Sequence, residues 1–198
     1  MENLLFIHKF CIGKKYAIIG ESGSGKSILV KLLLGMLKPK SGEIFYDEKN
    51  IKDIDISKIA TYISQDIFIY NASGMDNVTL FDYKRKKDLD YYIDLLKVRE
   101  LMERNLGELG RNISGGEKNR IAILRALNME TKIIVLDESL ANLDELNKKE
   151  ITDFLLGLKD IMIILITHDY DEDYLNKFDE IIKMEKGKVK EIKKNMKI

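Results

Sequence analysis

The stretch GESGSGKS at residues 20–27 lies between an apolar run, YAII, and a second one, ILVKLLLGML. Its three glycines let the backbone turn so that consecutive N–H groups converge on one point. The helix expected to follow presents its positive N-terminal end to the same point, where a polyphosphate fits. A flexible Gly/Ser turn would explain the glycines. It would not explain a lysine and a serine that open a helix directly after a strand.

The stretch matches the phosphate-loop pattern G-x-x-x-x-G-K-[ST]. Lys26 would reach the terminal phosphates of a nucleotide, and the Ser27 hydroxyl would ligate Mg²⁺. The predicted loop consists of Gly20, Glu21, Ser22, Gly23, Ser24, Gly25, Lys26 and Ser27.

Apolar β-rich runs alternate with helical patterns along the rest of the chain. The strands expected from these runs cover 4–12, 16–20, 42–46, 60–64, 132–137 and 161–167, with a final hairpin around Gly187. The expected helices cover 26–37, about 115–128 after an N-cap at Ser114, 145–157 and 170–177, with a mostly helical middle over 75–105. Strands that are apolar on both faces and alternate with helices indicate a parallel sheet covered on each side.

Two carboxylates follow one of these strands. The run KIIVLD ends at Asp137, and Glu138 comes directly after it. An acid at a strand end often only caps a turn, but a second carboxylate beside it, downstream of a phosphate loop, favours a functional pair. Asp137 would hold Mg²⁺ directly or through water, and Glu138 would orient or activate the attacking water.

The segment ISGGEKNRIAILRAL at 113–127 places a second small-residue turn at a helix start. Such a turn is another anion site. One chain has no need of two such sites on one triphosphate, unless the second serves the other copy in a dimer. The body of the helix also fits an ordinary core helix, and both interpretations can hold together. The turn consists of Ser114, Gly115, Gly116 and Glu117.

Composition narrows the class of protein. The chain has 198 residues, 45% of them hydrophobic and 33% charged, with a formal net charge of +0, so it is globular and not expected to bind nucleic acid. The lone Cys11 cannot form an internal disulfide, which fits a reducing compartment. No apolar run approaches the ~20 residues that cross a bilayer, so the chain itself is expected to be soluble. The basic stretch KGKVKEIKKNMK is expected to be a solvated strand and terminus.

Taken together, these motifs resemble the nucleotide-binding domain of ATP-binding cassette (ABC) transporters, in the family's motif order and over almost the whole chain. The stretch 20–27 resembles the Walker A loop, and Asp137 with Glu138 resembles the Walker B motif and catalytic glutamate. ISGGE at 113–117 resembles the signature LSGGQ, with Ile for Leu and Glu for Gln.

Three further residues resemble family positions. Gln65 in ISQD resembles the Q-loop glutamine, Asp144 in SLANLD the D-loop aspartate, and His168 in LITHD the switch histidine. The resemblance implies an ATPase with ATP and Mg²⁺ as cofactors. It implies catalytic roles for Glu138, His168, Lys26 and Gln65, and Mg²⁺ held by Ser27, Gln65 and Asp137.

The resemblance also implies partners. Two copies, as a homodimer or heterodimer, would sandwich ATP between the Walker A loop of one and the signature turn and Asp144 of the other. A transmembrane domain would hold the pair at the cytoplasmic face of the cell membrane. The stretches QDIFIYNASGMDNVTLF and LGELGRNISGG resemble the exporter branch of the family.

The fold that the resemblance implies is α/β. It is a P-loop NTPase with a mainly parallel sheet core flanked by helices, plus a small helical subdomain. Residues 1–65 and 129–198 are expected to form the RecA-like core with short antiparallel strands. Residues 66–128 are expected to form the helical subdomain that carries the signature motif.

One family feature lacks a counterpart. The family places an aromatic residue that stacks on adenine well upstream of the Walker A loop, whereas only Met1 to Ile19 precede Gly20 here. Phe6, Phe10 and Tyr16 are expected to pack with the first strands instead. Loss of one base–aromatic stack, ~1–3 kcal/mol, would weaken ATP binding by about one to two decades.

Three other functions are also compatible with the sequence. One is a soluble regulatory or DNA-repair ATPase of the same superfamily, although no long coiled-coil or zinc insertion is visible. Another is a truncated cassette that binds ATP but hardly hydrolyses it. The third is a P-loop GTPase or nucleotide kinase; NKKE at 147–150 nearly mimics a guanine-reading motif but ends in Glu. A GTPase or kinase has no need of the Ser-Gly-Gly turn.

Overall fold

The structure is a computed structural model that describes residues 8–83, 89–140, 143–168 and 171–195. The chain divides into two compact units. Unit 1 comprises residues 1–62, 132–138 and 158–198, and unit 2 comprises residues 63–131 and 139–157. Residues 139–157, expected with the core, thus group with the helical segment. The functional boundary between core and subdomain stays a prediction.

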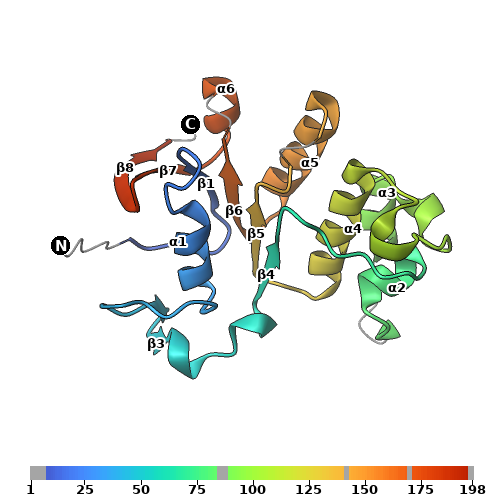
Figure 1. Ribbon diagram of the computed structural model, residues 1–198, viewed down its shortest axis with the longest axis horizontal. Helices are drawn as coiled ribbons and strands as arrows, with labels where there is room; N and C mark the ends of the chain where they lie inside the picture. The colour runs from blue at the N-terminus through green and yellow to red at the C-terminus, as the bar shows by residue number, and fades with distance from the viewer. Residues whose placement is uncertain (1–7, 84–88, 141–142, 169–170, 196–198) are drawn as a thin grey trace. The chain divides into compact units, whose positions relative to one another are not determined.

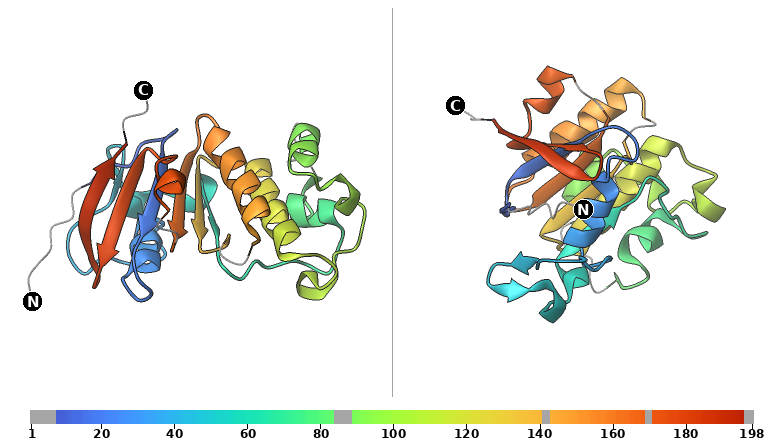
Figure 2. Two further views of the ribbon diagram at one scale, coloured as in Figure 1. Left: turned by 90° about the horizontal axis from the view of Figure 1, so that it is seen from above. Right: turned by 60° about the vertical axis from the view of Figure 1, so that its left-hand side comes forward.

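Unit 1 is built on a six-stranded sheet with the order β4-β5-β6-β1-β7-β8 (Figure 1). Its strands are β1 Lys15–Ile19, β4 Ala60–Ile63, β5 Ile133–Asp137, β6 Met162–Thr167, β7 Glu180–Glu185 and β8 Lys188–Lys194. Strand β1 pairs in parallel with β6 and β7, and β5 pairs in parallel with β6. Strand β8 returns antiparallel on β7 as the predicted hairpin, at the edge of the sheet (Figure 2). The predicted mainly parallel α/β fold is confirmed.

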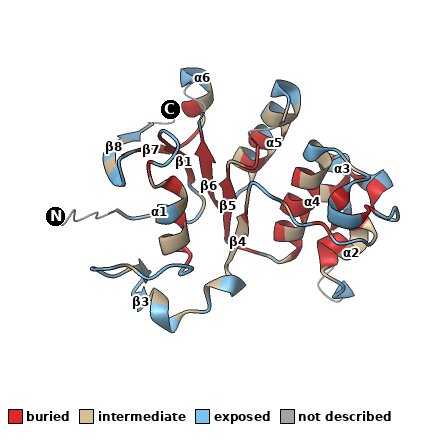
Figure 3. Cartoon of the chain, viewed as in Figure 1, coloured by how far each residue is buried: buried red, intermediate tan, exposed pale blue. Residues whose placement is uncertain are grey.

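The central strands are buried along their whole length, as Figure 3 shows for β1, β5 and β6. Helix α1, Lys26–Leu33, packs on one face of this sheet through Val30. The buried residues of this core are Tyr16, Ile18, Val30, Leu34, Ile133, Val135, Met162, Ile164, Ile166, Ile182 and Met184. Both faces of these strands are buried. This is why their sequences are runs of Ile, Val and Leu without alternating polar residues.

Helix α1 ends four residues earlier than the sequence pattern predicts. Gly35 adopts a φ of 66°, and its N–H donates to the carbonyl of Leu32 at 3.0 Å. The next N–H, of Met36, donates to the carbonyl of Lys31 at 2.9 Å. These two bonds form a Schellman motif, which stops a helix where glycine can take the left-handed conformation. The apolar run LLLGML continues past that stop as an irregular segment.

The first predicted strand, 4–12, lies partly outside the described residues, and residues 8–12 contain no strand. The backbone N–H of Cys11 donates to the Tyr16 hydroxyl at 2.7 Å instead of to a neighbouring strand. The rings of Phe10 and Tyr16 pack edge to face with centroids 4.8 Å apart, as do those of His8 and Phe10. The predicted packing role of Phe10 and Tyr16 is confirmed; Phe6 lies outside the described residues.

The remaining elements of unit 1 are short. A small hairpin joins β2, Phe45–Tyr46, to β3, Lys49–Asn50, so the strand expected over 42–46 is reduced to its last two residues. Two 3₁₀ turns, Ile51–Asp53 and Ile56–Lys58, lead to β4. Helix α6, Glu172–Leu175, occupies only part of the helix expected over 170–177.

Unit 2 is helical. It contains α2 Gly74–Thr79, α3 Leu89–Leu95, α4 Gly115–Asn128, α5 Glu145–Gly157 and 3₁₀ turns at Arg99–Leu101 and Glu108–Gly110. Helices α4 and α5 match their predicted bounds, and Ser114 is the predicted N-cap of α4. None of the helices within the described ranges is long and apolar enough to cross a membrane.

Candidate functional site

Unit 1 brings three strand ends together at one edge of its sheet. Strands β5, β6 and β1 are parallel neighbours, with Asp137 in register with Ile166 and Ile19 in register with Thr167. The loop after β1, Glu138 after β5 and His168 after β6 therefore open at the same edge. The carboxyl edge of parallel strands is where α/β folds bind their ligands.

The loop at 20–27 depends on close backbone packing. A Cβ on Gly20 would lie 2.4 Å from the carbonyl oxygen of Met184, so only glycine fits there. Gly25, at a φ of 98°, is the N-cap of α1, and the Ser24 carbonyl accepts the N–H of Gly187 at 2.9 Å. The turn of the β7–β8 hairpin thus packs against the loop 20–27. This loop geometry requires the glycines that the sequence pattern supplies.

Lys26 is held at the centre of this loop. Its side chain is only 4% exposed, and its ammonium donates to the carbonyls of Gly20 at 2.9 Å and Glu21 at 3.0 Å. The same ammonium lies 3.6 Å from a carboxylate oxygen of Glu138. The ammonium therefore lies inside the loop, where an anion held by the loop N–H groups would meet it.

The start of α1 is suited to that anion. The N-cap Gly25 contributes no side-chain cap, and the first turn of α1 holds no acidic residue. The Ser24 hydroxyl is buried and has no hydrogen-bond partner among the described residues. Free N–H groups, the positive helix end and an orphaned hydroxyl all fit phosphate oxygens.

Ser27 and Asp137 form an oxygen pair beside the loop. The Ser27 hydroxyl donates to Oδ1 of Asp137 at 3.1 Å. Within the described parts of the chain, no group of three or more His, Cys, Asp or Glu could hold a metal ion. One carboxylate and one hydroxyl suit Mg²⁺, which keeps several waters and shares its coordination with substrate phosphates. The residues therefore fit a magnesium ion that arrives with a nucleotide.

Tyr62 is a residue at this site that the sequence patterns missed. From β4, its hydroxyl donates to Oδ2 of Asp137 at 2.5 Å, so both Asp137 oxygens are engaged. Burial, followed by the hydrogen bond to Asp137, raises the pKa of Tyr62. A tyrosine in a short strand carries no recognisable signal, and its distance from Asp137 along the chain hides the contact.

Replacing Tyr62 with phenylalanine is expected to lower the free energy of unfolding by about 1.5–3 kcal/mol, the cost of a lost hydrogen bond to a charged group. The reason is that the largely buried Oδ2 of Asp137 would lose its donor. Urea unfolding in EDTA measures the effect, with Tyr91→Phe as the control because that side chain is 67% exposed. Equal stability of the Tyr62 variant and the parent protein would show that the hydroxyl does not hold Asp137.

Glu138 and His168 form an ion pair next to Lys26 of the loop. Nε2 of His168 lies 2.6 Å from Oε1 of Glu138, the same oxygen that faces Lys26. Glu138 has a φ of 52°, a left-handed conformation that is uncommon for a residue with a side chain. Such conformations cost about 1–3 kcal/mol, and the packing around Glu138 must offset that cost. The glutamate is therefore fixed between two basic groups and is only partly buried.

The other predicted site residues belong to unit 2. Gln65 follows β4 and is exposed. At the start of α4, Ser114 and Glu117 form a capping box in which Oε2 of Glu117 accepts from the Ser114 N–H at 2.7 Å and hydroxyl at 2.8 Å. Asp144 is exposed and precedes α5. Within unit 2, Gly116 faces Asn147, so the turn that opens α4 and the first turn of α5 lie side by side.

Comparison with known proteins identifies the family. The sequence profile described as ABC transporter matches residues 8–141. The chain is 36% identical over 186 residues to the lactococcin-G-processing and transport ATP-binding protein LagD of Lactococcus lactis, covering 87% of this chain and 26% of that protein. It is 34% identical over 188 residues to an ABC transporter ATP-binding protein of Pyrococcus horikoshii, covering 88% of this chain and 70% of that protein. The chain thus spans about a quarter of the length of relatives such as LagD.

Two solved structures share the fold. A bacterial Atm1-family ABC exporter with ATP bound matches with a TM-score of 0.80 at 24% identity, covering 93% of this chain and 34% of that one. The protein cbiO1 of Clostridium perfringens, described as part of the ABC transporter complex cbiONQ, matches with a TM-score of 0.80 at 29% identity, covering 93% of this chain and 78% of that one. From its motifs, its fold and these relatives, this chain belongs to the ABC transporter family of ATP-binding proteins.

Proposed function

We propose that the chain binds ATP with Mg²⁺ at the loop 20–27, hydrolyses it, and thereby powers an ABC transporter. We propose further that this transporter is an exporter. The observation that carries this proposal is the meeting of Lys26, Asp137, Glu138 and His168 at one sheet edge, around a helix start without a side-chain cap. Each group has the chemistry that phosphoryl transfer to water needs.

The roles follow from the contacts. Lys26 and the loop N–H groups would stabilise the charge that develops on the γ-phosphate. Ser27, Asp137 and Gln65 would hold Mg²⁺, which would neutralise negative charge on the phosphates. Glu138 would orient the attacking water and accept its proton, and His168, already 2.6 Å from Glu138, would keep that carboxylate directed and contact the γ-phosphate.

A second copy would complete the site. On unit 2, Ser114, Gly115 and Asp144 are exposed, and Gly116 and Glu117 are half-buried. We place these residues against the ATP of the other copy, as a homodimer or heterodimer. ATP would then favour the closed dimer because it contacts both copies, and hydrolysis would remove that preference.

Coupling to a membrane-spanning partner is supported by an aromatic cluster on unit 2. Phe68, Tyr70 and Phe81 are 55%, 40% and 56% exposed, and consecutive ring centroids lie 4.9 and 5.7 Å apart. Exposed aromatic patches of this kind mark contact surfaces for other proteins. We propose that a transmembrane domain docks here and holds the chain at the cytoplasmic face of the membrane. The transport proteins among the relatives support the same assignment.

The test is nucleotide-dependent dimerisation. Glu138→Gln protein, incubated with Mg²⁺ and ATP, is expected to elute from a sizing column as a dimer, and with ADP or without nucleotide as a monomer. Lys26→Ala in the same background is the control, because loss of nucleotide binding should abolish the dimer. A monomer at saturating ATP would contradict the cassette mechanism and favour a nucleotide kinase or GTPase, neither of which needs the Ser-Gly-Gly turn.

A further inference from the structure

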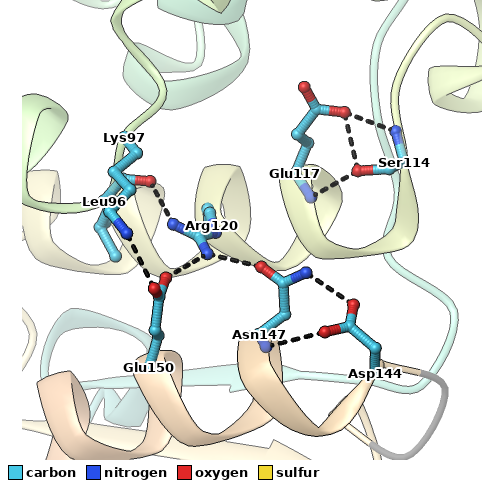
Figure 4. A network of polar contacts seen from close by, with 8 residues as sticks. All are labelled: Leu96, Lys97, Ser114, Glu117, Arg120, Asp144, Asn147 and Glu150. Atoms are coloured by element: carbon cyan, nitrogen blue, oxygen red, sulfur yellow. Dashed lines mark hydrogen bonds and ion pairs between the residues drawn. The ribbon is translucent and has the colours of Figure 1, made fainter.

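A buried arginine in unit 2 connects three segments. Arg120 lies on α4, and its side chain is 9% exposed (Figure 4). One terminal nitrogen donates to the carbonyl of Leu96 at 2.9 Å, and the other donates to Asn147 at 2.7 Å and to Glu150 at 3.0 Å. Because these three hydrogen bonds come from both terminal nitrogens, the side chain ties α4 to Leu96 and to the start of α5 in one geometry.

The orientation of the Asn147 amide follows from this contact. An arginine has only donors, so the Asn147 oxygen must face Arg120 and the amide nitrogen must face the other way. On that other side, Nδ2 of Asn147 donates to Oδ2 of Asp144 at 2.6 Å, and the backbone N–H of Asn147 donates to Oδ1 at 3.0 Å. Arg120 is thus connected to Asp144 by hydrogen bonds through Asn147 (Figure 4). These hydrogen bonds from Asn147 lower the pKa of Asp144.

The same residues touch the first turn of α4. A Cβ on Gly116 would lie 3.6 Å from the side chain of Asn147, and a Cβ on Gly115 would lie 3.9 Å from that of Leu143. The turn that begins at Ser114 and the residues around Asp144 are therefore adjacent. A simple N-cap for α5 would need only the backbone N–H bond to Asp144; it would not need the amide or the arginine.

We propose that Arg120 and Asn147 are positioning residues that fix Asp144 beside the first turn of α4, so that Asp144 and this turn meet a second copy as one preformed surface. This inference rests on the proposed ATP-dependent dimer. A preorganised surface binds more tightly because less conformational freedom is lost on association. Releasing Asp144 should weaken dimerisation without changing how one copy binds nucleotide.

The experiment uses Asn147→Ala in the Glu138→Gln background. We expect the ATP-dependent dimer to dissociate about tenfold more readily, the effect of one lost contact, while the affinity of the monomer for ATP is unchanged. Asn147→Asp should weaken the dimer further, because a second carboxylate would face Asp144. Lys97→Ala is the matched control: it removes the exposed ion pair of 2.8 Å with Glu150 and leaves Asn147 bonded.

A double-mutant cycle separates positioning from general loss of stability. In an Asp144→Ala background, Asn147→Ala should have no further effect on dimerisation, since its target is already gone. An equal effect in both backgrounds, or parent-like dimerisation of Asn147→Ala, would overturn the inference.

Amide hydrogen exchange of the monomer gives an independent readout. Residues 143–147 should exchange faster in Asn147→Ala than in the parent or in Lys97→Ala. Unchanged exchange would exclude a positioning role whether or not the dimer forms. Failure of the Glu138→Gln parent to dimerise would instead count against the proposed function, so the two failures are distinguishable.

Discussion

Glu138→Gln protein is expected to bind ATP and to turn it over at least about a hundredfold more slowly than the parent protein, since a general base contributes roughly 10²–10⁴-fold. Glutamine keeps the shape of the side chain but cannot accept the proton of the attacking water. It also removes the charge that lies 2.6 Å from His168 and 3.6 Å from Lys26. Phosphate release under saturating ATP and Mg²⁺ measures turnover, and equilibrium binding of a fluorescent ATP analogue measures affinity.

A matched control for this variant is Glu185→Gln. Glu185 pairs with Lys190 on the β7–β8 hairpin, and both side chains are exposed. The control should therefore retain parent-like turnover. If Glu138→Gln also retained it, the glutamate would lose its proposed role, and another group would have to direct the water.

Lys26→Ala is expected to weaken ATP binding by roughly thirtyfold to several thousandfold, since truncating one partner of a buried, hydrogen-bonded charge costs about 2–5 kcal/mol. The Lys26 side chain is 4% exposed, and its ammonium donates to two carbonyls of the loop, so the substitution affects both phosphate binding and loop geometry. Isothermal titration with ATP and Mg²⁺ measures the affinity, and a thermal melt shows whether the variant is folded.

Lys190→Ala serves as the control for Lys26→Ala, because it removes a lysine from an exposed pair on the same unit. ATP binding by that control should equal that of the parent protein. Parent-like ATP affinity of a folded Lys26→Ala protein would refute the assignment of the loop as the phosphate site.

The elements that could be predicted from the sequence are those whose local signals agree with their packing. Helix α4 begins at the expected Ser114 because the capping box is local, and β5 ends at Asp137 because the apolar run ends there. Helix α1 was predicted too long because LLLGML continues its apolar pattern past Gly35, where the backbone turns left-handed. The apolar run at 4–12 predicts a first strand, but in its described part the Cys11 N–H bonds to the Tyr16 hydroxyl instead.

Some residues of the candidate site could be predicted from sequence motifs, and others could not. Lys26, Ser27, Asp137, Glu138 and His168 were expected from motifs, and the parallel order β5-β6-β1 places them at one edge. The bond from Tyr62 to Asp137 and the relay from Arg120 through Asn147 join residues far apart in the chain. No local pattern specifies which distant side chain completes a hydrogen bond, so these contacts required the structure.

The terminal hairpin has a role that its basic, solvent-facing composition conceals. The carbonyl of Met184 packs against Gly20. In the hairpin turn, Cα of Gly187 lies 3.3 Å from the position that a Cβ on Gly25 would occupy. A shortened protein that lacked β7 and β8 would lose the packing that holds the loop 20–27 in place. The loop around Lys26 would then become disordered, although every motif residue was still present in the sequence.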